Sequence, residues 1–521
     1  MSKIEKLLYK IDKILAKYPN SKIWLFLFLS VVFVVFGAIL LSFKEDFFRA
    51  LWDSWTYFAD PGTHVAVEGG YLRFISVFIT ILGLLFFAVL IGLVSEVIEE
   101  KIDSLKLGKS KVFEENHIVI LGFSSQIIPI IKQLQLANSN NIVILSQLPK
   151  LEMEEFLSSN DIDNVICRNG DIDNIYYLNK INIQKSKSII IVSNNDELNL
   201  KLILLLTKKL KLNIPINIEI KDEEFKESLN FLEKEYPNLN FIYTKQSLAR
   251  LLALSAIYIG IGQTYDKLFD YKGDSFYLIE NISFLDKSLF EIATMIDERV
   301  CGIYSNQENF LKIDKNYKYQ KDDKLLIISN NSDYNLTTQT YNLQDINFQE
   351  IKNNNVNIIG DNEKKEFILD ELNIRKIKIT PRSKNLILIG KNDNEVISNL
   401  LLLRKKYTNI LTEVYTDDLV KVLSKEDIND YIISHQLVAK LLVSVSFSNE
   451  LNLIINDLLD KGGNIMYIIK VDNSISYSDL YFSLLNQNII PIGVIDNEII
   501  LNPKADYSIK NQEILVISNK G

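Results

Sequence analysis

The segment "HIVILGFSSQIIPIIKQLQLANSNNIVILSQ", residues 117–147, decides the fold of most of the chain. Two short runs of branched apolar residues, "HIVILGF" and "NIVILSQ", flank a stretch of helical length. Strands that are buried on both faces have continuous apolar runs, and parallel strands need a crossover between them. The segment therefore predicts a strand, a helix and a second strand parallel to the first.

Four further strand-like runs follow, and most are separated by helix-length stretches: "VICRNGD", "SIIIVSN", "INIEIKD" and "FIYTK". This alternation predicts a doubly wound parallel sheet of the Rossmann class. A dinucleotide site in this class needs three glycines and an acid after the second strand. Gly122 is present, but Ser124 and Ile127 replace the other glycines and Gln147 stands at the acid's position. We expect no NAD and interpret Gly122 and Ser124 as a nucleotide-loop remnant; a different nucleotide or an ion remains open.

The pattern recurs later in the chain. "YTKQSLARLLALS", residues 243–255, matches "ISHQLVAKLLVSV", residues 433–445, and "FLKIDKNYKYQKDDKLLIISN" matches "IILNPKADYSIKNQEILVISN". Each repeat is predicted to contain a Rossmann-like lobe, a crossing helix and a small β-rich lobe, over residues 117–335 and 350–521. The second Rossmann lobe is shorter, with the strand candidates "NVNIIG", "IRKIKIT" and "NLILIG".

Two uncharged runs, residues 23–43 and 74–95, precede these repeats. Each has the length that a helix needs to cross hydrocarbon, so residues 23–101 are predicted to form a two-span membrane domain joined by a linker, 102–116. Residues 1–22 place apolar side chains at helical spacing, which indicates an amphipathic helix at the membrane surface or an ordinary packing helix. Their six lysines predict cytosolic N- and C-termini.

The loop between the runs contains "DFFRALWDSWTYFADPGTH", residues 46–64. Phe47, Leu51, Trp55 and Phe58 share a helical face, and Pro61-Gly62 ends the helix. A helix followed by irregular backbone between two spans suggests a re-entrant pore loop, since such backbone at membrane depth must line water or be buried in protein. The alternative is an extracellular turn.

The loop also aligns without gaps to the potassium-channel pattern of an aromatic pore helix and a TVGYG-like filter, although only one glycine coincides. In that register Trp52 and Trp55 support the pore helix. The filter consists of Ala59, Asp60, Pro61, Gly62, Thr63 and His64. A ring of Asp60 side chains or nearby carbonyls is the candidate cation site; the alternative is that Asp60 caps the helix.

One two-span unit cannot enclose a pore, so a homotetramer in the lipid bilayer is expected. Gly83 and Gly92 in the second run allow either a gating hinge or close packing. Strand-end acids are candidates for a ligand or calcium site, or are ordinary solvated caps. These acids are Asp171, Asp173, Asp196, Glu197, Asp222, Glu223 and Glu224.

The amino-acid composition of the chain argues against several other classes of protein. The net charge of −9 does not favour nucleic-acid binding, so no nucleic-acid partner is expected. Cys167 and Cys301 are too far apart in sequence to suggest a disulfide framework, and the three histidines are scattered, so the identity of any metal stays unknown. No catalytic constellation is present, which argues against an enzyme such as a membrane-tethered NAD-dependent oxidoreductase.

Four segments carry a family resemblance from about residue 45 onward: "ALWDSWTYFADPGTH", "GLVSEVIEEKIDSLKLGKSKVFEENHIVILGF", "VICRNGDIDNIYYLNKINIQKSKSIIIVSN" and "YKYQKDDKLLIISN". The chain resembles channels with tandem RCK (TrkA-N-like) domains, and more closely the CASTOR/POLLUX family of ion channels. The resemblance implies a tetrameric, ligand-gated cation channel, permeable to potassium or calcium, with a cytosolic gating ring of eight RCK domains. Relatives in plants lie in nuclear envelopes, but the Asn/Ile/Lys-rich composition favours a bacterial plasma membrane. The alternative is an RCK-type regulatory subunit of another transporter.

Overall fold

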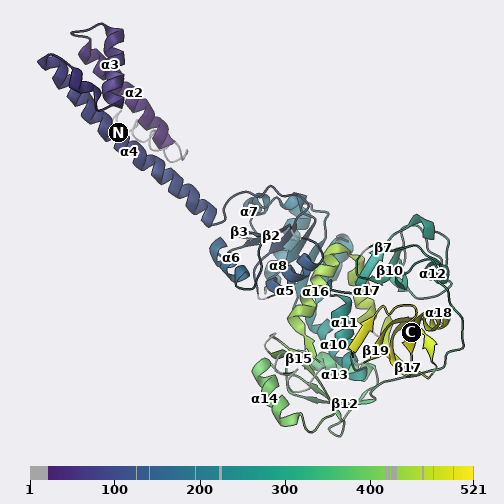
Figure 1. The fold of residues 1–521 in the computed structure, drawn as a ribbon. Coiled ribbons are helices and arrows are strands. Elements are labelled where there is room, and N and C mark those ends of the chain that lie inside the picture. The colour runs from purple at the N-terminus through teal and green to yellow at the C-terminus, as the bar shows by residue number, and fades with distance from the viewer. Residues whose placement is uncertain are drawn as a thin grey trace. The chain divides into compact units, whose positions relative to one another are not determined.

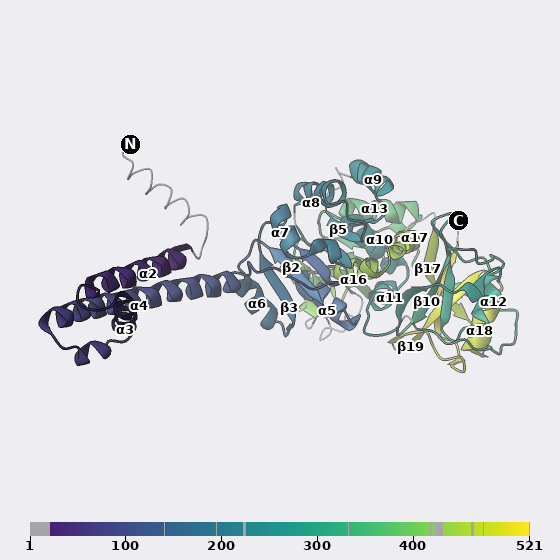
Figure 2. The same cartoon turned by 90° about the horizontal axis from the view of Figure 1, so that it is seen from above.

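The computed structural model describes residues 21–124, 126–139, 141–193, 195–221, 226–331, 333–416, 419–420, 423, 431–459, 463–472, 474–496 and 498–519. The chain divides into two compact units between Ser110 and Lys111. Figures 1 and 2 show the fold from two directions. The amphipathic helix predicted for residues 1–22 lies almost wholly outside the described residues.

The described part of the first unit consists of α-helices and one short 3₁₀ turn. Their bounds are α2 (Ser21–Leu41), α3 (Phe47–Ala59), η1 (Thr63–Ala66) and α4 (Gly70–Lys106). The stretch Ile23–Leu41 and part of α4 are long and apolar enough to cross a membrane. Large apolar side chains lie on the outside of both helices; Trp24 is 71% exposed and Phe74 is 72% exposed. Such a surface suits contact with lipid.

Helix α4 is longer than a membrane span. It has 37 residues, which corresponds to roughly 55 Å, whereas the hydrocarbon core is about 30 Å thick. The helix therefore continues past the predicted domain limit at residue 101. The last residues of the predicted linker pack on the second unit. Val112 is buried, and the Asn116 N–H donates to the carbonyl oxygen of Lys185.

Helix α3 is attached to both long helices through their backbones. Ser54 Oγ donates to the carbonyl oxygen of Val34 in α2, at 2.8 Å. Thr80 Oγ1 of α4 donates to the carbonyl oxygen of Tyr57, at 3.1 Å. Gly83 of α4 lies against the end of α3, where an added Cβ would come within 2.1 Å of the Phe58 carbonyl oxygen. The absence of a side chain at Gly83 therefore sets how closely α3 and α4 approach.

The second unit contains two parallel sheets. The first has the strand order β3-β2-β1-β4-β5-β6 and the second has the order β13-β12-β14-β15-β16. The strands of the first sheet are β1 (Ile118–Leu121), β2 (Ile142–Ser146), β3 (Val165–Asn169), β4 (Ser188–Ile191), β5 (Ile216–Ile220) and β6 (Leu239–Tyr243). Those of the second are β12 (Asn355–Ile359), β13 (Lys378–Ile379), β14 (Asn385–Leu388), β15 (Asn409–Val414) and β16 (Tyr431–Ile433).

Helices cover these sheets as expected for a doubly wound fold. On the first sheet they are α5 (Ile127–Leu136), α6 (Lys150–Ser158), α7 (Ile175–Lys180), α8 (Asp196–Leu204) and α9 (Lys226–Glu235), with short turns η2 (Ile183–Lys185) and η3 (Leu205–Lys209). On the second they include α13 (Lys365–Ile374) and α14 (Asp393–Leu403). The second sheet has one strand fewer, in line with its shorter sequence.

Each parallel sheet is followed by an antiparallel one. The first antiparallel sheet, in the order β7-β10-β8-β9, comprises β7 (Ser275–Ile279), β8 (Arg299–Ser305), β9 (Phe310–Lys312) and β10 (Lys324–Ser329). The second, in the order β11-β17-β22-β19-β20, comprises β11 (Phe348–Glu350), β17 (Asn464–Val471), β19 (Ile489–Asp496), β20 (Glu498–Leu501) and β22 (Glu513–Asn519). Small elements complete these lobes: η5 (Ile282–Phe284), α12 (Leu289–Ala293), α18 (Tyr477–Leu485), β18 (Ile475–Ser476) and β21 (Ser508–Ile509).

The two crossing helices, α10 (Thr244–Ile257) and α16 (Ser434–Phe447), are exchanged between the repeats. Helix α10 packs against α13, β14 and β15 of the second lobe, whereas α16 packs against α5, β4 and β5 of the first. α10 leads into α11 (Ile261–Leu268) and α16 into α17 (Glu450–Leu459). Because each repeat covers the sheet of the other, the two repeats form one compact unit (Figure 1).

A basic residue at the same position of each crossing helix reinforces this exchange. Arg250 Nε lies 3.0 Å from Glu371 Oε1 of α13. Its counterpart Lys440, with its side chain only 5% exposed, lies 3.0 Å from Asp270 of the first repeat. Burial raises the pKa of the Asp270 carboxyl, but the Lys440 ammonium outweighs it and holds this pKa below its usual range.

The repeats also share a constrained glycine after their first strands. Gly122 follows β1 and Gly360 follows β12, with φ of +102° and +100°. A Cβ at Gly122 would come within 2.2 Å of the Val192 carbonyl oxygen, and one at Gly360 within 1.7 Å of the Ile389 carbonyl oxygen. Both the backbone angle and the close approach require glycine. The predicted loop at Gly122 is thus a tight turn beside β4.

Replacing Gly83 tests the packing of α3 on α4. We expect Gly83→Ala to lower the stability of the membrane unit by about 1–3 kcal/mol, because backbone atoms must move apart. All three tryptophans lie in this unit, at positions 24, 52 and 55, so the thermal midpoint of tryptophan fluorescence measures its unfolding. Gly92→Ala is the control, since a Cβ there meets no heavy atom within 4 Å. Equal midpoints for the two variants would contradict the packing role.

Replacing Gly360 tests the turn after β12. We expect Gly360→Ala to lower the free energy of unfolding of the second unit by about 3 kcal/mol or more, since strain and a clash with backbone add. The measurement is thermal unfolding of the detergent-solubilised chain followed by circular dichroism. Gly273→Ala serves as the control because a Cβ there has no neighbour within 4 Å. If the Gly360 variant were as stable as this control, position 360 would not require glycine.

Candidate functional site

The predicted filter segment forms a tight turn at the end of α3. Asp46 begins the helix by accepting a hydrogen bond from the Phe48 N–H, at 3.1 Å. At the other end Asp60 Oδ1 accepts the Gly62 N–H, at 2.8 Å, and Thr63 Oγ1 donates to the Asp60 carbonyl oxygen, at 2.8 Å. Asp60 therefore shapes this turn, while its side chain stays exposed to the outside of the single chain.

The neighbouring filter candidates lie on both sides of that turn. Ala59 is the last residue of α3, and Thr63 and His64 begin η1. Pro61 and Gly62 join the two elements in an exposed turn. The end of α3 thus leads into irregular backbone, as the sequence predicted.

Most of the aromatic residues of α3 are exposed in the single chain. The buried residues of α3 are Ala50, Ser54 and Phe58, whereas Trp52 and Trp55 are 67% and 52% exposed. The two tryptophans line a hollow of about 500 Å³ between α2 and α3. They do not support the helix from within their own chain, and of the predicted face only Phe58 is buried. Periodicity identified residues that share a face, but it did not show which face the other helices cover.

The four predicted acids that the structure describes are not collected into one site. Asp171 accepts a hydrogen bond from Gln147 Nε2, at 2.9 Å, and Asp173 forms an ion pair with Lys201. Asp196 accepts the Lys221 N–H, at 3.0 Å, beside the exposed Glu197 at the start of α8. Asp222, Glu223 and Glu224 lie outside the described residues. Among those described, no group of three or more His, Cys, Asp and Glu side chains could hold a metal ion. A calcium site stays a prediction.

A cavity of about 160 Å³ lies between the repeats, where the carboxyl ends of both parallel sheets meet the first turns of α10 and α16. Sequence reasoning did not single it out. Its wall contains Gln126, Glu219, Lys221, Thr244, Lys245, Leu248, Glu363, Lys364, Glu413, Tyr415, Ser434, His435 and Val438. The aligned repeat at 243–255 and 433–445 was the signal that could have located it, since six of these residues lie in that repeat.

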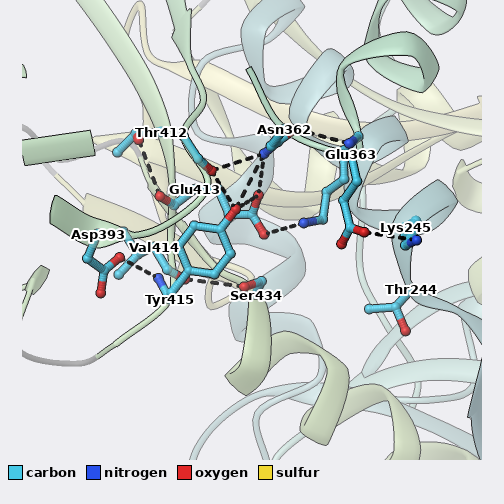
Figure 3. Close-up of polar contacts among 12 residues, drawn as sticks. Thr244, Lys245, Asn362, Glu363, Asp393, Thr412, Glu413, Val414, Tyr415 and Ser434 are labelled. Carbon is cyan, nitrogen blue, oxygen red and sulfur yellow. Dashed lines mark hydrogen bonds and ion pairs between the residues drawn. The ribbon is translucent and has the colours of Figure 1, made fainter. Parts of the chain in front are cut away.

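Buried ion pairs organise the wall of this cavity. Lys364 Nζ lies 3.1 Å from Glu413 Oε1, and their side chains are 7% and 0% exposed. Tyr415 lies 3.1 Å from the other Glu413 oxygen, and Lys245 of the first repeat lies 2.9 Å from Glu363 of the second (Figure 3). Burial, and then the charge of Glu413, raises the pKa of Tyr415, so its hydroxyl remains protonated and can donate.

Residues 118–234 match the family model described as the TrkA-N domain. The chain is 30% identical over 351 residues to the Pisum sativum protein named "Probable ion channel SYM8", which covers 63% of this chain and 39% of that protein. It is 30% identical over 352 residues to the Lotus japonicus protein "Ion channel CASTOR", covering 63% of this chain and 41% of that one. The chain thus spans about two fifths of the length of these curated relatives.

Among solved structures, the human SLO3 gating ring superposes with a TM-score of 0.56 at 12% identity, covering 77% of this chain and 98% of that chain. At this identity the similarity concerns the fold alone. The relatives are named as ion channels, in agreement with a chain that is not an enzyme. The resemblance inferred from the sequence is confirmed: over 63% of its length this chain is similar to the CASTOR, POLLUX and DMI1 ion channels, and residues 118–234 match the TrkA-N domain.

Proposed function

We propose that the protein is a cation channel whose pore is formed by residues 46–64 of several subunits and whose opening is controlled by the cytosolic unit. The observation that carries this proposal is the end of α3. This helix stops at Asp60 between two membrane-length helices, and irregular backbone follows it. The kinship with proteins named ion channels supports the same function.

The carboxyl end of α3 has the electrostatic character that attracts a cation. The carboxyl end of a helix carries a partial negative charge, and a carboxylate or carbonyl oxygens beside it add to the attraction. Several copies of Asp60 around an axis would make a ring of oxygen ligands. Since only Gly62 coincides with the potassium-filter pattern, both potassium and calcium remain candidates for the permeant ion.

The open face of α3 supports an oligomer. Phe48, Trp52 and Trp55 are each more than half exposed in the single chain. A neighbouring subunit that packs on this face would bury the tryptophans and at the same time close the ring around the pore. We propose a homotetramer in the plasma membrane, with the RCK-type repeats of the four chains forming the gating ring.

Control by the cytosolic unit follows from the length of α4. This helix runs unbroken from the apolar span to Lys106, so a displacement at its polar end can move the span. A ligand opens such a channel only if it binds the open arrangement better than the closed one. Calcium is one candidate ligand, and whether α4 also bends at Gly92 stays a prediction.

Flux through the purified protein tests the proposal against its main rival. The chain is reconstituted alone into liposomes, and uptake of potassium, sodium and calcium is measured separately. We expect cation flux above that of empty liposomes. If none of the three ions passes under any condition that opens related channels, the chain would instead be a regulatory subunit of another transporter.

A charge-neutralising substitution tests the site of selectivity. Asp60→Asn keeps an oxygen that can accept the Gly62 N–H and removes the negative charge. We expect a several-fold lower cation conductance or a shifted bi-ionic reversal potential, because the ring of charge is lost. Glu68→Gln removes an exposed acid from the same loop and serves as the control. If the Asp60 variant conducted and selected ions like this control, Asp60 would be only a helix cap.

A further inference from the structure

The wall of the interlobe cavity is built from equivalent residues of the two repeats. Gln126 stands four residues after Gly122, as Lys364 does after Gly360. Glu219 lies in β5 and Glu413 in β15, the strands that follow β4 and β14 across their sheets. The cavity therefore lies between two copies of one structural site.

The first turns of the crossing helices contribute further matching pairs. Thr244 and Ser434 are the first residues of α10 and α16, and Lys245 and His435 come next. Leu248 and Val438 follow one helical turn later, at the apolar end of the cavity. The two copies can thus be compared residue by residue.

In the second repeat, side chains of the same repeat supply all the polar partners of the Glu413 carboxylate described here. Glu413 is fully buried, and one of its oxygens is paired with the Lys364 ammonium at 3.1 Å. Its other oxygen lies 3.1 Å from the Tyr415 hydroxyl and 3.4 Å from Asn362 Nδ2, which donates to it (Figure 3). A buried carboxylate is stable when it is paired and hydrogen-bonded in this way.

The copy in the first repeat lacks these partners. Glu219 is 4% exposed, and within the described residues its carboxylate accepts one hydrogen bond, from Thr244 Oγ1 at 2.9 Å. At the position of Lys364 stands Gln126, which carries no charge. Lys221 stands at the position of Tyr415, and among the described residues Glu219 itself forms no ion pair. A buried carboxylate with one neutral donor thus lines a cavity and lacks a cation.

The size of the cavity limits what can supply that cation. Its volume of about 160 Å³ corresponds to roughly five water molecules at 30 Å³ each. Pockets for drug-sized ligands measure about 300–1,000 Å³, so a dinucleotide would not fit. A compound of amino-acid size fits. Lys245 and Lys364 are already paired with Glu363 and Glu413. Glu219 is the carboxylate of the cavity wall for which the described residues show no ion pair.

We propose that the interlobe cavity binds a small primary ammonium compound, whose ammonium group takes beside Glu219 the place that the Lys364 ammonium takes beside Glu413. Three N–H donors on such a group can contact the open carboxylate oxygen and neighbouring acceptors. Binding here does not depend on whether the chain conducts ions. As the cavity wall comes from both repeats, an occupant contacts both and favours the arrangement that encloses it.

Isothermal titration of the full chain in detergent micelles tests this site with four probes: methylammonium chloride, glycine, sodium acetate and tetramethylammonium chloride. We expect methylammonium to bind and acetate not to bind. Tetramethylammonium, which has the charge but no N–H donor, should bind at least about tenfold more weakly. Glycine that binds more tightly than methylammonium would identify a zwitterion as the natural class, and weaker binding a simple amine.

A substitution at Glu219 tests whether the measured heat of binding comes from this site. Glu219→Gln keeps an acceptor for Thr244 and removes the charge, so methylammonium should bind at least about tenfold more weakly. Glu197→Gln, which changes an exposed acid on α8, should bind like the wild type. If Glu219→Gln does not fold, the titration of the wild type with methylammonium and tetramethylammonium still tests whether binding requires an ammonium group with N–H donors.

Three outcomes would overturn the proposal. No heat with methylammonium or glycine would mean that the cavity holds only water. Unchanged binding to Glu219→Gln would place the ammonium site elsewhere. Calcium chloride that bound in a Glu219-dependent manner, without methylammonium binding, would make this a metal site. A chain that passes ions in liposomes and gives no heat with the amines would leave the channel function standing while the ammonium site failed.

Discussion

The exchange of α10 and α16 between the two repeats is the constraint on which the second unit depends. Part of the cover of each parallel sheet comes from the crossing helix of the other repeat, so neither sheet has its full cover within its own repeat. The residues at the centre of both helices, such as Ala249 and Ala439, are completely buried. Their small side chains permit the close packing that an exchanged helix needs.

The exchange also explains where charge is buried. Arg250 and Lys440 occupy the same position of the repeat, and each reaches an acid on a partner repeat. Each pair belongs to a small ionic cluster, since Glu371 also lies 3.5 Å from Arg375 and Lys440 also lies 2.7 Å from Asp266. The pairs therefore fix which helix faces which sheet. They make the two repeats one body, although the sequence suggests two consecutive domains.

Much of this fold could be predicted because its strands are buried on both faces. Runs such as "HIVILG" and "SIIIVS" have no polar interruption, and that pattern is specific to strands in a covered parallel sheet. The strands β15 and β16 were not identified, since "NILTEV" and "YII" carry polar residues or are very short. The two long apolar helices were predictable from the length and composition of their uncharged runs.

The side-chain partners could not be predicted in the same way. Gln147 stands at the position of a ribose-binding acid, but its actual partner Asp171 follows a different strand. The exposure of Trp52 and Trp55 depends on which face of α3 the long helices cover, and helical spacing contains no such information. The cavity between the repeats required the exchange of α10 and α16, which no local pattern encodes.

The two repeats differ at the equivalent sites. The second repeat has one strand fewer in its parallel sheet and has Lys364 and Tyr415 around Glu413, so its copy of the site is closed by its own side chains. The first repeat has the longer sheet, and its Glu219 lines the cavity. Helix α10 begins at this cavity and packs along α13 of the second repeat. A change of charge at Glu219 therefore acts at the start of one rigid helix that is bound to both repeats.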